Sequence, residues 1–169
     1  MKKPTRRDRG PERQRPNTKN QKCEKMKRTI EIEDTLQDRV DLCIEETKEL
    51  LLEYIKDNEP DETPCLFNDL DYSGGFHEIV DSNTPIYTHE INTIFYLHGH
   101  LCEEAFENCF GAEAKKDEGW SCGWKAAAIY QYISDQTAAW YNENAQDILL
   151  KENEGMANRL KPAALAPAN

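Results

Sequence analysis

The feature that most constrains the fold is a long run of apolar and small residues spaced three and four apart. Between Thr29 and Asn58 this run comprises Ile32, Leu36, Val40, Cys43, Thr47, Leu50, Leu51 and Tyr54. Such spacing places side chains on one face of an α-helix, so the sequence predicts a long helix with one buried face. Pro60 and Pro64 follow, and because proline has no amide hydrogen the helix is expected to end before them. Residues 59–75 are then a loop.

The rest of the chain predicts further helices at about 76–81, 85–98, 101–110 and 124–153. Thr84 followed by Pro85 is typical of a helix start, with threonine as the N-cap and proline in the first turn. Gly99 is expected to end that helix. Residues 111–123 are polar and bounded by glycine, which indicates a loop.

The last predicted helix repeats the pattern of the first. Its apolar stripe consists of Ile129, Ile133, Thr137, Trp140, Tyr141, Ala145, Ile148 and Leu149. No segment of useful length alternates between apolar and polar residues as a β-strand would. The sequence therefore predicts an all-α fold, a single compact helical domain of about five helices with one long N-terminal helix.

Charge divides the chain into three parts. Residues 1–28 hold 12 Lys and Arg against 3 Asp and Glu, residues 29–155 hold 7 against 29, and residues 156–169 add two positive charges. The first part has no aliphatic residue to offset its ordering entropy, and the last part is biased towards alanine and proline. We therefore expect a disordered basic arm at 1–28, an acidic helical domain with a net charge of −22 at 29–155, and a loose C-terminal tail at 156–169.

Composition also bears on location and partners. The chain has no 18-residue apolar run, and its beginning lacks the apolar stretch of a secretory signal. A soluble, intracellular protein is expected. A strongly acidic body repels nucleic acid and anionic membranes and is attracted to basic surfaces, so the expected partner is a protein that carries positive charge.

Histidine and cysteine offer two candidate sites. His77-Glu78 and His89-Glu90 resemble catalytic pairs, but neither has the second histidine four residues on that a zinc protease helix needs. His98, His100 and Cys102, together with Cys109 or Cys122, offer zinc ligands, yet the paired short spacings of structural zinc sites are missing. The spacing of Cys102 and Cys109 also suits two core residues on one helix face.

The same reasoning extends to the remaining cysteines and to other motifs. The six cysteines form no CxxC pair and are expected to be reduced, mostly as small core residues: Cys23, Cys43, Cys65, Cys102, Cys109 and Cys122. Asp69 and Asp71 are better explained as turn-stabilising residues than as a cation site. No phosphate loop, dinucleotide fingerprint or nucleophile elbow is found. We expect no catalysis, no cofactor and no metal.

The carboxylates of the first helix form the remaining signal. Ten occur between residues 31 and 57: Glu31, Glu33, Asp34, Asp38, Asp41, Glu45, Glu46, Glu49, Glu53 and Asp57. A helix of that length spans about 40 Å, so they average one per roughly 4 Å, close to the spacing of about 3.4 Å between phosphates on one DNA strand. A charge run is usually a solvated face. The net charge of −22 on the domain adds weight to a functional interpretation, because it carries self-repulsion.

Two blocks of sequence, "FHEIVDSNTPIYTHEI" and "AAIYQYISDQTAAWYNENAQDILL", resemble the phage-encoded Ocr family, the overcome-classical-restriction proteins. The matching positions are Pro85, Tyr87, Ile129, Tyr130, Trp140, Glu143 and Asp147. The resemblance covers roughly residues 30–152. The basic arm, the six cysteines, the loop at 111–123 and a C-terminus that is not strongly acidic depart from the family's pattern.

The resemblance implies an acidic, mainly α-helical homodimer whose carboxylates imitate the phosphates of bent duplex DNA. Such a protein occupies the DNA groove of restriction-modification enzymes, particularly type I, in the host cytoplasm. The expected phosphate-mimicking residues are Asp34, Asp38, Asp41, Glu45, Glu49 and Glu53, followed by Glu103, Glu104, Glu107, Asp135, Glu143 and Asp147. Two alternatives remain open: a helical scaffold or virion component that binds nucleic acid through its arm, and a metalloenzyme.

Overall fold

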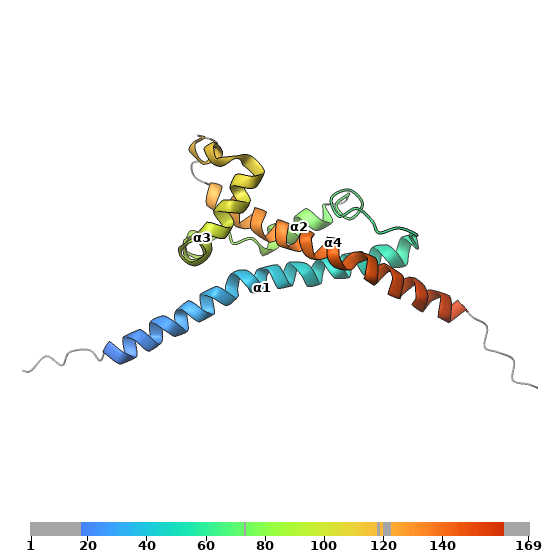
Figure 1. Ribbon diagram of the computed structural model, residues 1–169, viewed down its shortest axis with the longest axis horizontal. Coiled ribbons are helices and arrows are strands. Elements are labelled where there is room, and N and C mark those ends of the chain that lie inside the picture. Colours follow the sequence, from blue (N-terminus) through green and yellow to red (C-terminus); the bar gives the residue numbers. More distant parts are fainter. Residues whose placement is uncertain (1–17, 73, 118, 120–122, 161–169) are drawn as a thin grey trace, which may run out of the picture.

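The computed structural model describes the backbone of residues 18–72, 74–117, 119 and 123–160, and side chains within these ranges from Thr35 to Ala157. This part of the chain contains four α-helices, one 3₁₀ helix and no strand: α1 (Thr18–Asn58), α2 (Gly75–Asn83), α3 (Thr88–Phe110), η1 (Ala112–Lys116) and α4 (Trp124–Leu160). The all-α prediction is confirmed. Figure 1 shows α1 and α4 as the two long helices, and α4 packs against α1, α2 and α3.

The helices enclose one hydrophobic core, so the described residues form a single compact unit. Residues 1–17 of the basic arm and 161–169 of the tail lie outside the described residues, while the backbone of 18–28 belongs to α1. At the other end α4 continues to Leu160, beyond the predicted limit at residue 155.

The core contains the buried faces that the apolar spacing predicted. In α1, Leu36, Val40, Cys43, Thr47 and Leu51 are buried, and Ile55 extends the stripe by one turn. In α4 the buried residues are Ile129, Ile133, Thr137, Tyr141, Ala145 and Leu149, together with Ala128 and Ser134. Burial of these apolar side chains, at about 25 cal/mol per Å², is the main stabilising term for the helix pair.

Aspartates hold the loop between α1 and α2. Asp69 Oδ2 accepts a hydrogen bond from the Cys65 amide at 2.6 Å, and Asp71 Oδ1 accepts one from the His77 amide at 2.8 Å. The second contact satisfies an amide of the first turn of α2, which has no partner within the helix. Gly74, at φ 82°, supplies the left-handed residue that precedes α2. The prediction that these aspartates stabilise a turn is confirmed.

The predicted helix start at Thr84 is wrong. Thr84 is the C-cap of α2: its amide donates to Asp81 O at 3.1 Å and its hydroxyl to Val80 O at 2.8 Å. Its ψ of 132° is extended, because the ring of the following Pro85 disfavours helical geometry in the preceding residue. The next helix, α3, begins only at Thr88.

The predicted helix end at Gly99 is also wrong, because α3 continues through it to Phe110 and unites two of the predicted helices. A Cβ at residue 99 would lie 3.1 Å from Phe95 Cδ1, so the glycine makes room for the phenylalanine ring of the preceding turn. The same helix corrects another prediction. Cys102 is buried as expected, whereas Cys109 is exposed.

The loop predicted at 111–123 contains the 3₁₀ helix η1. Lys115 fastens η1 to α3 by donating hydrogen bonds to Glu103 and Glu107. Its ammonium group also lies 5.5 Å from the centre of the Trp124 ring, at the start of α4. One cation therefore connects three successive elements.

Candidate acidic interaction surface

The solvent face of α1 carries the carboxylates that the sequence predicted. Asp38, Asp41, Glu45, Glu49 and Glu53 are all exposed, while the residues between them supply the buried stripe. Successive members are three or four residues apart, so they follow one another at about 4.5 to 6 Å along the helix axis. The side chain of Asp34 lies outside the described residues.

Most of these carboxylates have no cation within ion-pair distance among the described residues. Glu45 lies 3.7 Å from Lys48 Nζ, and Asp41 accepts a hydrogen bond from the neutral Gln37 amide at 2.9 Å. Within the described part of the chain, no ion pair involves Asp38, Asp41, Glu49 or Glu53. The face therefore presents a row of charges available to an outside partner.

Arg39, which follows Asp38 in the sequence, is engaged with the other helices. Its guanidinium group donates to Asn83 O at 2.7 Å and lies 3.7 Å from the Glu90 carboxylate. Asn83 in turn donates to Glu46 Oε2 at 3.0 Å. These contacts fix α1 to the C-terminal end of α2 and the first turn of α3, so α1 is held rigidly where its carboxylates are displayed.

The second group of predicted residues divides into three sets. Glu103 and Glu107 are half-buried and paired with Lys115, whose pKa is raised by its hydrogen bonds to these two carboxylates. One ammonium group compensates half of their combined charge, which makes them poorer phosphate mimics than the unpaired carboxylates of α1. Glu104 and Asp135 are exposed and line one groove between α3 and α4, which nothing in the sequence indicated because they lie on different helices.

Glu143 and Asp147 form the third set. Both are exposed on α4, one turn apart, and no ion pair joins either of them to another described residue. Tyr141 and Ala145, which alternate with them in the sequence, are buried in the core. The structure thus keeps them accessible without involving them in the core.

The histidine-glutamate pairs have structural surroundings. His77 Nδ1 lies 2.5 Å from Asp71 Oδ2, and its ring stacks on Tyr130 at a centroid distance of 6.5 Å. His89 stacks on Tyr87 at 5.8 Å. Among the described residues, no three His, Cys, Asp or Glu side chains gather in a way that suits a metal ion.

Burial makes two cysteines poor nucleophiles. It raises the pKa of Cys43 and of Cys102 to about 12, because the thiolate would lose its hydration inside the core. Cys65 and Cys109 are exposed. Neither buried thiol is therefore activated as a nucleophile. All four cysteines with described side chains are free of disulfide bonds.

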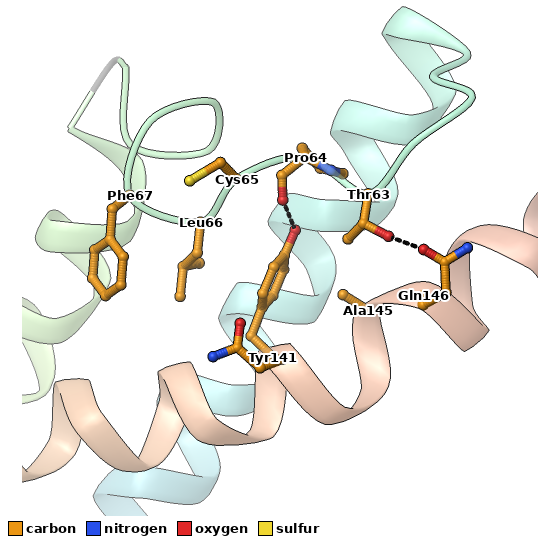
Figure 2. A pocket seen from close by; sticks show the side chains of 9 residues that line it. Thr63, Pro64, Cys65, Leu66, Phe67, Tyr141, Ala145 and Gln146 are labelled. Carbon is orange, nitrogen blue, oxygen red and sulfur yellow. Dashed lines mark hydrogen bonds between the residues drawn. The ribbon is translucent and has the colours of Figure 1, made fainter.

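An open pocket of about 340 Å³ lies between the loop after α1 and α4. Figure 2 shows the side chains that line it. Tyr141 donates to Pro64 O at 2.6 Å, and Thr63 donates to Gln146 Oε1. These bonds join the two walls and hold the loop on α4. Thr63, Tyr141 and Gln146 therefore use their polar groups to connect the loop to α4. No carboxylate lines the pocket.

No protein-family model, no curated protein and no solved structure matches this chain. Across the residues that the structure describes, no helix combines the length and the apolar character needed to cross a membrane. The surface chemistry and the sequence of the chain itself are therefore what bear on its function.

Proposed function

We propose that this protein is a non-catalytic, DNA-mimicking inhibitor of a DNA-binding defence enzyme. The observation that carries the proposal is the row of exposed carboxylates on α1, among which Asp38, Asp41, Glu49 and Glu53 have no described cation within ion-pair distance. The net charge of −22 on residues 29–155 supports it. In the proposed mechanism, these carboxylates meet the Lys and Arg residues that line the enzyme's DNA channel and exclude DNA by competition.

The target we propose is a type I restriction-modification enzyme, and the setting is a phage protein acting as a homodimer in the host cytoplasm. This part follows from the resemblance to the Ocr family at residues 76–91 and 127–150. Electrostatic attraction predicts fast association that weakens with salt. Many small terms share the binding energy, so no single carboxylate is expected to be essential.

Cleavage of unmodified DNA by a type I restriction enzyme, with the protein titrated in, tests the proposal. Protection at a stoichiometric ratio and low salt is expected. Neutralising four α1 carboxylates, as D38N/D41N/E49Q/E53Q, should weaken protection by about fourfold or more, since four exposed ion pairs at roughly 0.2–1 kcal/mol each amount to about 0.8–4 kcal/mol. A control with the same change in charge, E59Q/D61N/E62Q/D117N, should weaken it much less. Equal losses in both variants would remove α1 from the interface.

A second candidate function has its own observation, the 12 Lys and Arg of residues 1–28. A scaffold or virion component would use this arm to bind nucleic acid, because each basic side chain can displace a phosphate counterion. Gel-shift assays on duplex DNA, with the full-length protein and a variant lacking residues 2–28, separate the two functions. DNA binding that depends on the arm, without inhibition of the enzyme, would replace mimicry by the scaffold function.

A further inference from the structure

The groove between α3 and α4 is a hollow in the acidic surface. It measures about 250 Å³ and is open to solvent. Leu101, Glu104 and Asn108 line it from α3, and their spacing of three and four residues places them on one helix face. The side of α4 that lines it contributes Tyr132, Asp135 and Gln136.

The carboxylates of this groove come from two helices, and neither is paired with a cation in the part of the chain that the structure describes. No ion pair joins Glu104 or Asp135 to another residue in the described ranges, and the nearby Lys115 is occupied by Glu103 and Glu107. Asp135 Oδ1 accepts a hydrogen bond from Gln131 at 2.7 Å, which leaves its other oxygen available. The groove thus holds two negative charges next to apolar and amide side chains.

We propose that this groove receives one arginine side chain from the partner enzyme. The inference rests on the proposed function, which supplies a partner with a basic channel. An arginine fits the lining better than a lysine does, because its planar guanidinium group carries five donors and stacks on aromatic rings. Glu104 and Asp135 can accept hydrogen bonds at different edges of that plane, while Tyr132 and Leu101 offer surface to the face of the guanidinium group and to the methylene groups.

Binding of the enzyme to paired charge variants is the first test. The groove variant E104Q/D135N should bind a type I restriction enzyme about tenfold more weakly than the unchanged protein, as expected when a desolvated charge pair is lost. The variant E143Q/D147N removes the same charge from exposed positions outside the groove, and its loss should be about twofold. Equal losses in the two variants would show that the groove holds no arginine and contributes only general charge.

A second test does not need the enzyme. N-acetyl-arginine amide is titrated into the isotope-labelled full chain, and the side-chain amide signals of Asn108 and Gln136 are followed by NMR. Saturable shifts are expected with arginine, smaller ones with N-acetyl-lysine amide, and none in E104Q/D135N. Far-UV circular dichroism confirms that the variant is folded.

The two tests separate failure of the groove from failure of the proposed function. Shifts that are absent, or unchanged in the variant, overturn the groove even when the protein inhibits the enzyme. Saturable shifts in a protein that leaves the restriction enzyme unaffected support an arginine site and overturn the proposed target.

Discussion

At the scale of single residues, the cysteines show how burial determines chemistry. Cys43 and Cys102 are fully buried, and burial raises the pKa of each thiol to about 12, from 9.0 in an unfolded chain. The folded state thus holds both thiols protonated over a range where the unfolded state releases those protons. This contribution to stability is fully present below pH 9 and is lost as the pH rises towards 12.

We therefore predict that the free energy of unfolding falls as the pH rises above about 9. Each thiol should contribute a slope of up to roughly 1.4 kcal/mol per pH unit inside this window. Urea unfolding of Cys102→Ala should show a shallower slope than the unchanged protein, although the variant is less stable overall because a cavity forms. The exposed Cys65→Ala is the control and should retain the full slope. An unchanged slope in Cys102→Ala would contradict the assignment.

Some residue contacts followed from the sequence and others did not. The buried positions of α1 and α4 were predictable, because helical periodicity is a local property of the chain. The pairing of Lys115 with Glu103 and Glu107 was not, since it requires η1 to fold back on α3. For the same reason the sequence could not separate these two carboxylates from Glu104, which faces the groove.

At the scale of helices, glycine has a different role at each position. Gly75 opens α2, where a Cβ would lie 2.8 Å from Leu70 O and 3.2 Å from Leu50 Cδ2. Gly155 lies inside α4, and a Cβ added there would meet no atom within 4 Å apart from the neighbouring backbone of the helix itself. Gly99 was expected to end a helix, because sequence alone does not show that Phe95 lies across it. The atoms around each glycine therefore determine whether a side chain can be accommodated there.

Substitution of two of these glycines by alanine should change stability in opposite directions. Gly75→Ala should lower the free energy of unfolding by about 1–3 kcal/mol, because the backbone oxygen of Leu70 cannot move away without disturbing the turn. Gly155→Ala should raise it by up to about 1 kcal/mol, since alanine favours the helix and meets no obstacle. Denaturant unfolding monitored by circular dichroism measures both. Stabilisation by Gly75→Ala would show that α2 does not sit this close to Leu70.

At the scale of the whole molecule, the negative charge that opposes folding through self-repulsion is the charge that the proposed function uses for binding. The domain at 29–155 carries 7 positive residues against 29 negative ones. The total was available from composition, whereas its distribution required the structure. The structure places Asp38, Glu49 and Glu53 in the open and engages Arg39 with α2 and α3.

Salt should consequently have opposite effects on stability and on inhibition. Raising NaCl from about 0.01 M to about 0.15 M shortens the screening length from about 30 to 8 Å. Repulsion within the domain then weakens, so the midpoint of thermal unfolding should rise, while protection against the restriction enzyme should decline. Sucrose is the control: it should raise the midpoint without weakening protection. A midpoint that falls with salt would mean that internal ion pairs outweigh the repulsion.

The division of α1 into two faces affects how this protein can evolve. Leu36, Val40, Cys43 and Leu51 maintain the core from one side, while the carboxylates of the other side make few contacts within the fold. Substitutions on the outer face therefore escape the purifying selection that packing imposes. Under the proposed function, the acidic residues of this face can therefore change position during evolution to match a changing target enzyme, while the core and the fold are retained.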